Sequence, residues 1–330
     1  MSIDNWSEPQ WLTEVSTWIA AELGHRGLVL RGVPQQIYTR PWSTIVQAPT
    51  ADATYFFKAV IPLLAYEAAL TEQLAQWQPD LLPPLLAIDA ARGWLLMADG
   101  GTRLRTVLQT SQDIGHWQRV LPQYAALQIK LSQAQESCLQ LGVPDRRVTR
   151  LPDLFATLLQ DQVALGLDTP DGLTHAEWAQ LSEAAALVRE QCSRLAAAPI
   201  PMTLDHGDFH DGNIFIHDRG YWFFDWGDCS VTHPFFSLRT TFVSVENTFG
   251  VAEDDPLFNQ LRDAYLEPWC AFAPQAELRR LFAITQQLAP ISAALRWQMA
   301  LSTLAPATRN DYRAAVPSLC REFLQLSRVG

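Results

Sequence analysis

Apolar residues follow one pattern in the first hundred positions and another in the rest of the chain. Between residues 6 and 23 they recur every three or four positions, which predicts an amphipathic helix. The short apolar runs that follow have the length of β-strands, and we expect them to form a five-stranded antiparallel sheet with a helix at 63–77. The predicted strands lie within 36–49, which is interrupted at 40–43, and at 55–61, 83–89 and 93–97.

From residue 102 onward the apolar spacing is mostly helical, and we interpret the aliphatic stripes as core. The sequence therefore predicts an α+β protein with two lobes, a sheet-containing lobe at 1–98 and a larger, mainly helical lobe at 99–330. The predicted helices of the second lobe lie at 104–108, 114–141, 151–165, 175–198, 235–245, 256–267, 276–302 and 310–326.

Composition narrows the class of protein. The chain has 330 residues, 48% of them hydrophobic and 18% charged, which is typical of a globular protein long enough for two lobes. Its formal net charge of −11 argues against nucleic-acid binding, which requires a basic face, and is compatible with a cationic substrate. No apolar run reaches the roughly 18 residues of a membrane span, and the N-terminus lacks the pattern of a secretory signal. The five cysteines have no paired spacing, so we expect reduced thiols and a cytoplasmic location.

The segment 204–228, LDHGDFHDGNIFIHDRGYWFFDWGD, combines six aspartates with two apolar runs. These runs predict two short strands joined by a turn at 217–220, where an Asp-x-Gly sequence favours a hairpin. Since a hairpin brings its open ends together, we expect Asp208, Asn213 and Asp225 to converge. Convergent carboxylates need a positive charge between them, and a set of oxygen ligands suits Mg2+.

The motif His206-Gly207-Asp208-Phe209-His210-x-x-Asn213, followed by Phe224-Asp225-Trp226, resembles the catalytic loop and metal loop of the aminoglycoside phosphotransferase family. That family includes choline-kinase-like enzymes and has the two-lobe, protein-kinase-like fold. The resemblance implies a small-molecule kinase that transfers the γ-phosphoryl group of ATP or GTP to a hydroxyl, with Asp208 as catalytic base. It also implies that Asn213 and Asp225 hold Mg2+.

The same resemblance implies a nucleotide site in the first lobe. Lys58, inside the strand at 55–61, would bind the α- and β-phosphates. Glu67, one turn into the next helix, is expected to hold the lysine, with Glu72 as the alternative. Residues 98–101 resemble the linker between lobes, so Met97 and Asp99 are candidate nucleotide contacts.

Other positions leave alternatives open. Pro41 and Trp42 stand where glycines usually approach the phosphates, so Ser43 beside them is either a nucleotide contact or part of a structural turn. Ser237 stands where many relatives carry an aspartate that braces the catalytic loop, which implies a weaker brace or one from elsewhere. The loop-supporting candidates are His206 and His210. Asp228 is a candidate for the brace or for substrate contact.

Two other functions fit parts of the sequence. The residues around Gly207-Asp208-x-His210 resemble fragments of metal-dependent phosphoesterases. Those enzymes also need an upstream Asp-x-His and a histidine directly after the asparagine, where this chain has Ile214. A non-catalytic nucleotide-binding protein of the same fold is the second alternative. The motifs define a reaction class and leave the acceptor open. For a cationic acceptor, the candidate acids are Glu246, Asp254 and Asp255.

Overall fold

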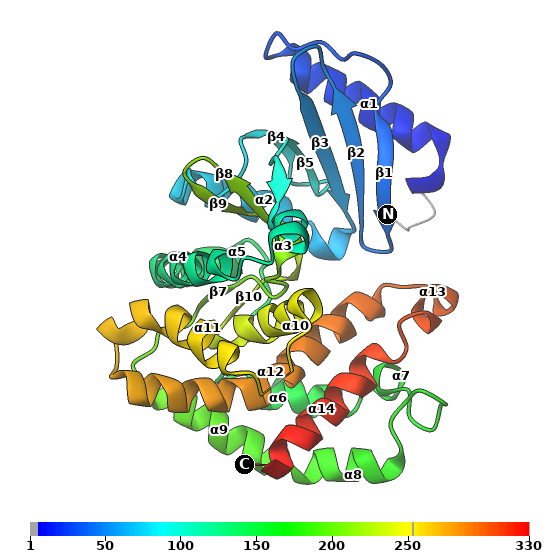
Figure 1. Ribbon diagram of the computed structural model, residues 1–330. Helices are drawn as coiled ribbons and strands as arrows, with labels where there is room; N and C mark the ends of the chain where they lie inside the picture. Colours follow the sequence, from blue (N-terminus) through cyan, green and yellow to red (C-terminus); the bar gives the residue numbers. More distant parts are fainter. Residues whose placement is uncertain (1–5, 253, 330) are drawn as a thin grey trace. The chain divides into compact units, whose positions relative to one another are not determined.

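The computed structural model describes residues 6–252 and 254–329 (Figure 1). The chain divides into two compact units, which we call the first and second units. The first comprises Met1–Val107 and Asp211–Gly227, and the second comprises Leu108–His210 and Asp228–Gly330. The segment 204–228 therefore starts in the second unit, contributes its hairpin to the first and returns. The lobe boundary after residue 98 stays a proposal.

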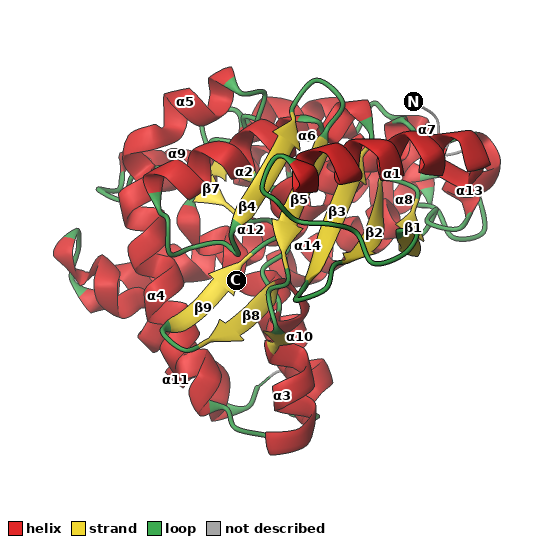
Figure 2. Cartoon of the chain, turned by 90° about the horizontal axis from the view of Figure 1, so that it is seen from above, coloured by secondary structure: helices red, strands yellow, loops and turns green. Residues whose placement is uncertain are grey.

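The first unit is built on the predicted five-stranded antiparallel sheet. Its strands lie in the order β1-β2-β3-β5-β4 (Figure 2), so that β3, which carries Lys58, is the central strand. The bounds are β1 (Gln35–Arg40), β2 (Ser43–Pro49), β3 (Thr54–Val60), β4 (Leu85–Asp89) and β5 (Trp94–Ala98). The interruption expected at 40–43 is the tight connection between β1 and β2.

Helix α1 (Pro9–Gly24) packs on one face of this sheet (Figure 1) through aromatic contacts. Phe57 of β3 is fully buried, and its ring centroid lies 6.3 Å from that of Trp11, 5.7 Å from that of Trp18 and 5.3 Å from that of Trp94. All three pairs are edge-to-face, an arrangement worth about 0.5–1.5 kcal/mol per pair beyond burial.

This packing orients the lysine of the same strand. Successive residues of a strand point to opposite faces of the sheet, so the burial of Phe57 against α1 directs Lys58 to the other face. There it meets Glu67 of α2 (Tyr66–Trp77). Because side chains alternate between the two faces of β3, the apolar packing of Phe57 on one face fixes the position of the Lys58 ammonium on the other.

The hairpin predicted around residues 217–220 is present in the first unit. Strands β8 (Ile214–His217) and β9 (Gly220–Phe223) pair antiparallel, and β6 (Thr102–Arg103) pairs with β8 to complete a three-stranded sheet. Helix α3 (Leu104–Ser111) follows β6. The hairpin's open end therefore carries Asn213 on one side and Asp225 on the other.

The second unit is mainly helical, and its one pair of described strands consists of β7 (Thr203–Asp205) and β10 (Ser230–Thr232), which run antiparallel. Its helices are α4 (Gly115–Leu131), α5 (Gln135–Gln140), α6 (Leu151–Leu158), α7 (Gln162–Leu165), α8 (His175–Glu183), α9 (Ala185–Ala197), α10 (Leu238–Phe249), α11 (Pro256–Leu266), α12 (Gln275–Ser302), α13 (Pro306–Asn310) and α14 (Ala315–Val329). The predicted combination of an antiparallel sheet with a helical remainder is confirmed.

Several predicted helices are shorter than expected. The single helix at 114–141 is wrong, because α4 ends at Leu131 and α5 begins only at Gln135. Between them the Ser132 hydroxyl donates to the Ile129 carbonyl at 2.7 Å, and such side-chain bonds compete with the helical ladder. The helices predicted at 151–165 and 175–198 are likewise each divided in two, and the one predicted at 310–326 begins at Ala315.

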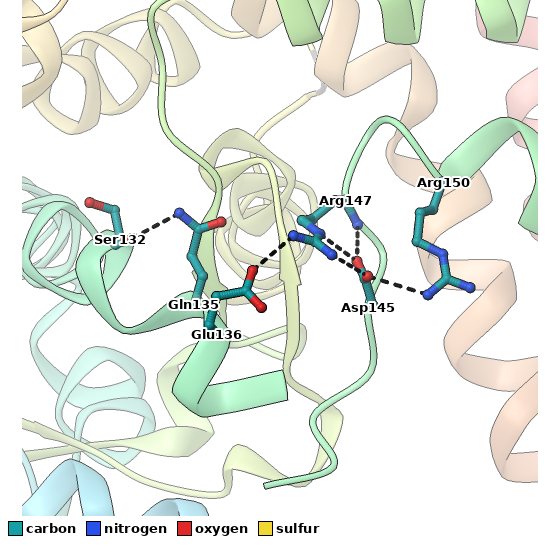
Figure 3. A network of polar contacts seen from close by, with 6 residues as sticks. All are labelled: Ser132, Gln135, Glu136, Asp145, Arg147 and Arg150. Carbon is teal, nitrogen blue, oxygen red and sulfur yellow. Dashed lines mark hydrogen bonds and ion pairs between the residues drawn. The ribbon is translucent and has the colours of Figure 1, made fainter. Parts of the chain in front are cut away.

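An ion-pair network fixes the chain between α5 and α6 (Figure 3). Asp145 accepts hydrogen bonds from Arg147 at 2.7 Å and Arg150 at 3.3 Å, and Arg147 also donates to Glu136 at 3.1 Å. Burial raises the pKa of Asp145, but the hydrogen bonds and charges of the arginines outweigh this effect and lower it. Asp145 also forms a β-bridge with Val231 of β10, so the network supports the strand pair that leads into the segment 206–210.

In the described residues, every helix is too short or too polar to cross a membrane. All five cysteines are free thiols, and Cys270 alone among them is exposed.

Candidate active site

A buried ammonium group organises the candidate nucleotide site in the first unit. Lys58 Nζ lies 2.5 Å from Glu67 Oε1 and 2.5 Å from Asp225 Oδ1. The Lys58 side chain is 10% exposed and that of Glu67 2%. Burial lowers the pKa of Lys58, but the two carboxylates outweigh it and raise the pKa above its ordinary value, so the ammonium stays charged. Glu67, rather than Glu72, is the helix carboxylate that reaches Lys58.

The loop that carries Asp225 is strained and clamped onto α2. Asp225 has φ +68°, in the left-handed region that costs a non-glycine residue about 1–2 kcal/mol. The Tyr66 hydroxyl donates to the Gly227 carbonyl at 2.5 Å. A Cβ on Gly227 would lie 3.0 Å from Glu67 Oε2, so the loop approaches α2 closely. Strain held in this way is typical of functional sites.

Asn213 is held at the other end of the same hairpin. Its side chain is buried, and its backbone carbonyl accepts a hydrogen bond from Phe224 N at 3.2 Å. The hairpin therefore places Asn213 opposite the residue that precedes Asp225. Arg105 adds an ion pair of 2.7 Å to the buried carboxylate of Asp211, which anchors the turn just before Asn213.

The other residues predicted to contact the nucleotide lie at or near the ends of strands of the five-stranded sheet. Ser43 is buried at the start of β2, and Met97 is half-buried on β5. Asp99 uses its carboxylate in a turn, where it accepts from Gly101 N at 2.8 Å. Gly100 packs against the Phe215 ring so closely that a Cβ would overlap it. The conformation of residues 98–101 is therefore fixed in part by the packing of Gly100 on Phe215 of β8.

The catalytic-loop candidate Asp208 lies in the second unit with both predicted supporting histidines. His210 Nε2 lies 3.2 Å from Asp208 Oδ2, and Asp208 N donates to His206 Nδ1 at 3.3 Å. Burial raises the pKa of Asp208, but the hydrogen bond and charge of His210, together with Arg296 and His206, lower it to about 2. Asp208 is therefore a carboxylate at neutral pH.

A buried network of hydrogen bonds from β7, α4 and Ser237 holds the loop that carries Asp208. Ser237 donates a short hydrogen bond to Asp205 Oδ1, and Tyr124 Oη lies 3.0 Å from Ser237 Oγ. Tyr124 in turn accepts from His206 N at 3.0 Å. Ser237 thus hydrogen-bonds a carboxylate from β7, whereas the assignment of the brace, for which Asp228 is a candidate, stays a prediction. Two members of this network were not predicted from the sequence. Tyr124 has the spacing of a core residue, and the one signal for Asp205 is that it is an acid inside a buried strand.

Gly207 is the point at which the loop turns. It has φ +77°, and a Cβ there would overlap the backbone carbonyl oxygen of Asp228. The Asp228 backbone therefore lies against Gly207, and Asp228 is half-buried. On α10, Thr241 Oγ1 donates to the Phe209 carbonyl at 2.8 Å, which fixes the residue after Asp208.

These features define a class of protein, a phosphotransferase with the protein-kinase-like fold. The chain belongs to the phosphotransferase enzyme family (APH), whose sequence profile matches residues 15–282. The resemblance, the fold class and the assignment as a phosphotransferase are thereby confirmed.

Solved structures agree with this fold. A macrolide 2'-phosphotransferase type I has a TM-score of 0.60 and 14% identity, with 92% of this chain and 97% of that chain covered. A choline/ethanolamine kinase family protein from Mesorhizobium loti has a TM-score of 0.57 and 18% identity, covering 97% and 100%. A spectinomycin phosphotransferase in complex with ADP and spectinomycin has a TM-score of 0.53 and 11% identity, covering 94% and 98%. Curated protein sequences show no significant match.

We expect Gly207→Ala to disrupt the catalytic loop, because its new Cβ would meet the Asp228 carbonyl oxygen. Gly250→Ala is the matched control: its φ of +64° is similar, but no heavy atom of the described residues lies within 4 Å of the added Cβ. The control should lose about 1 kcal/mol of unfolding free energy, and Gly207→Ala about 3 kcal/mol, by urea denaturation. Equal losses would contradict the steric argument.

Lys58→Met should reduce the unfolding free energy by about 3–5 kcal/mol, because it leaves the buried carboxylate of Glu67 without its ammonium partner. The double variant Lys58→Met/Glu67→Gln removes that uncompensated charge and should recover about half of the loss. Urea denaturation at pH 7 measures both. A double variant no more stable than the single one would show that the Lys58–Glu67 pair is not the source of the loss.

Proposed function

We propose that this protein transfers the γ-phosphoryl group of ATP or GTP to a hydroxyl of a small molecule. The acceptor oxygen forms a bond to the γ-phosphorus, the bond from that phosphorus to the β–γ bridging oxygen breaks, and the nucleoside diphosphate leaves. The hydroxyl proton goes to Asp208. The observation that carries the proposal is the buried ammonium of Lys58, held charged between Glu67 and Asp225.

The first unit supplies the nucleotide groups in this proposal. Lys58 binds the α- and β-phosphates, and Glu67 orients it. Met97, Asp99 and Ser43 are the further nucleotide contacts. The ADP in the related spectinomycin phosphotransferase structure supports nucleotide use.

Asn213 and Asp225 are the residues that would hold Mg2+. They offer oxygen donors, which Mg2+ prefers, and the Asp225 side chain is 43% exposed, so part of it is open to a ligand. No group of three or more His, Cys, Asp or Glu in the described residues could hold a metal ion, so phosphate oxygens would complete the ligand set. Bound there, Mg2+ would neutralise charge on the phosphates.

Asp208 acts mainly by position. A carboxylate whose pKa is about 2 is a weak base, but phosphoryl transfer has a loose transition state that needs an oriented hydroxyl more than early proton removal. The Asp208 side chain is 38% exposed, so it can accept a hydrogen bond from a bound alcohol. His210 and His206 hold it in place for that contact.

Asp208→Asn should lower kcat by about 10²–10⁴-fold while nucleotide affinity stays within about twofold. Coupled ATP-consumption assays with a panel of alcohols, 31P NMR of the product and calorimetry of ATP binding measure these quantities. Asp218→Asn, in the exposed hairpin turn, is the control and should retain wild-type kcat. Full activity of Asp208→Asn would exclude the assigned role.

The same measurements separate the alternatives. Nucleotide binding without turnover of any alcohol would favour a non-catalytic protein. Hydrolysis of phosphate esters with Mn2+ or Zn2+ and no nucleotide would favour a phosphoesterase.

His210→Gln should move the acid limb of kcat/KM to higher pH by about one unit or more. In the wild type, His210 helps to lower the pKa of Asp208 from 3.8 to about 2, against the effect of burial. Because the folded-state pKa is lowered, the stability that Asp208 contributes is present above pH 3.8 and is lost as the pH falls toward 2. Activity profiles that extend down to about pH 2, the pKa of Asp208 in the wild type, check the shift, and an unchanged acid limb would contradict it.

A further inference from the structure

An arginine lies directly against the catalytic loop within the second unit. Arg296 belongs to α12, and its Cδ lies 3.2 Å from the position that a Cβ on Gly207 would occupy. Gly207 immediately precedes Asp208. The guanidinium at the end of this side chain is also close enough to influence the carboxylates of both Asp208 and Asp205 electrostatically.

Arg296 differs from most arginines of the second unit, which are paired with acids. Arg147 and Arg150 share Asp145 (Figure 3), Arg313 pairs with Asp171 and Arg321 with Glu177. Arg296 forms no hydrogen bond and no ion pair within 4.0 Å in the described part of the chain, although it is half-buried.

A half-buried guanidinium that forms no hydrogen bond or ion pair with the described residues can bind a ligand. Partial burial of an unpaired charge is unfavourable, and here the carboxylates of Asp205 and Asp208 compensate it only from a distance. The five N–H donors of the guanidinium therefore stay open. Their planar arrangement matches a carboxylate or a phosphate, which it can bind through two parallel hydrogen bonds.

We propose that Arg296 selects an acceptor alcohol with an anionic group, a carboxylate or a phosphate ester, close to the hydroxyl that receives the phosphoryl group. This inference rests on the proposed function, in which Asp208 orients that hydroxyl. A small molecule that reaches Asp208 also comes within range of Arg296, since both border Gly207. A cation in that place is disfavoured by like charge.

An anionic acceptor differs from the cationic acceptor with which the net charge of −11 is compatible. Of the acids proposed to meet such an acceptor, Asp255 uses its carboxylate as the N-cap of α11, where it accepts from Leu257 N at 2.8 Å. Asp254 is exposed. Arg296 lies beside Gly207, and in this proposal its guanidinium meets the charged group of the acceptor whose hydroxyl Asp208 orients.

The test compares acceptors that differ in charge. Wild type, Arg296→Glu and Arg296→Lys are assayed with ATP and glycerate, glycerol 3-phosphate, glycerol, choline or spectinomycin, and the phosphorylated product is followed by 31P NMR. Arg280→Glu is the control, since Arg280 lies on the same helix with a 75% exposed side chain. Glycerate and glycerol 3-phosphate distinguish a carboxylate from a phosphate as the recognised group.

We expect wild-type kcat/KM for one of the anionic alcohols to exceed that for glycerol by about 100-fold. Arg296→Glu should remove this preference mainly through KM, Arg296→Lys should retain part of it, and Arg280→Glu should behave as wild type. Higher kcat/KM for choline or spectinomycin would overturn the proposal. An equal loss for every acceptor in Arg296→Glu would also overturn it, because Arg296 would then only balance Asp208 and Asp205.

If the proposed function is wrong, the outcome differs from a failure of anion recognition by Arg296. If wild type phosphorylates none of these compounds, thermal-shift titrations with glycerate, glycerol 3-phosphate and choline still decide the role of Arg296. Stabilisation by an anionic compound that Arg296→Glu abolishes and Arg280→Glu retains supports anion recognition. Stabilisation by choline alone, or no stabilisation by either anion, contradicts it.

Discussion

The first unit depends on one constraint, the removal of the Lys58 ammonium from water. A buried cation is tolerated only with anions in contact, and its two partners come from different parts of the chain, 9 and 167 positions away. One charge thereby joins the central strand, α2 and the loop after β9. The opposite face of β3 also helps to position Lys58. Phe57 packs against tryptophans on that face, so the side chain of Lys58 points to the α2 side.

Compensation of buried charge also accounts for the hydrogen bonds around Asp205, at the start of the loop that carries Asp208. Asp205 is fully buried, and burial raises its pKa. Hydrogen bonds from Ser237 and the loop backbone and the positive charge of Arg296 act in the opposite direction. In the sequence, Ser237 looks like the loss of a bracing carboxylate. In the structure a carboxylate is present, but it comes from β7 and Ser237 is its hydrogen-bond donor. Ser237 therefore takes part in holding the loop through its hydrogen bond to this carboxylate.

The sequence predicts what local periodicity and motif spacing encode. The five strands, the helix after β3 and the hairpin follow from short apolar runs and turn residues, and the spacing of Asp208, Asn213 and Asp225 identified the family. Helix breaks such as that at Ser132 depend on single side-chain bonds to the backbone, which periodicity does not register. Tyr66, Tyr124 and Arg296 were missed for a related reason. Helical spacing identifies the buried face of a helix, but it does not say which loop packs on a given turn.

The same distinction separates overall charge from local charge. A net charge of −11 describes the whole chain, but exposed charges further away than a Debye length of about 8 Å are largely screened at physiological ionic strength. A half-buried group such as Arg296 is screened much less. In our proposal, the electrostatic preference of the acceptor site is therefore determined by the few residues that border Gly207 and Asp208, among them Arg296. Membership of the phosphotransferase family defines the class of reaction, whereas we propose that these neighbouring side chains select the alcohol that takes part in it.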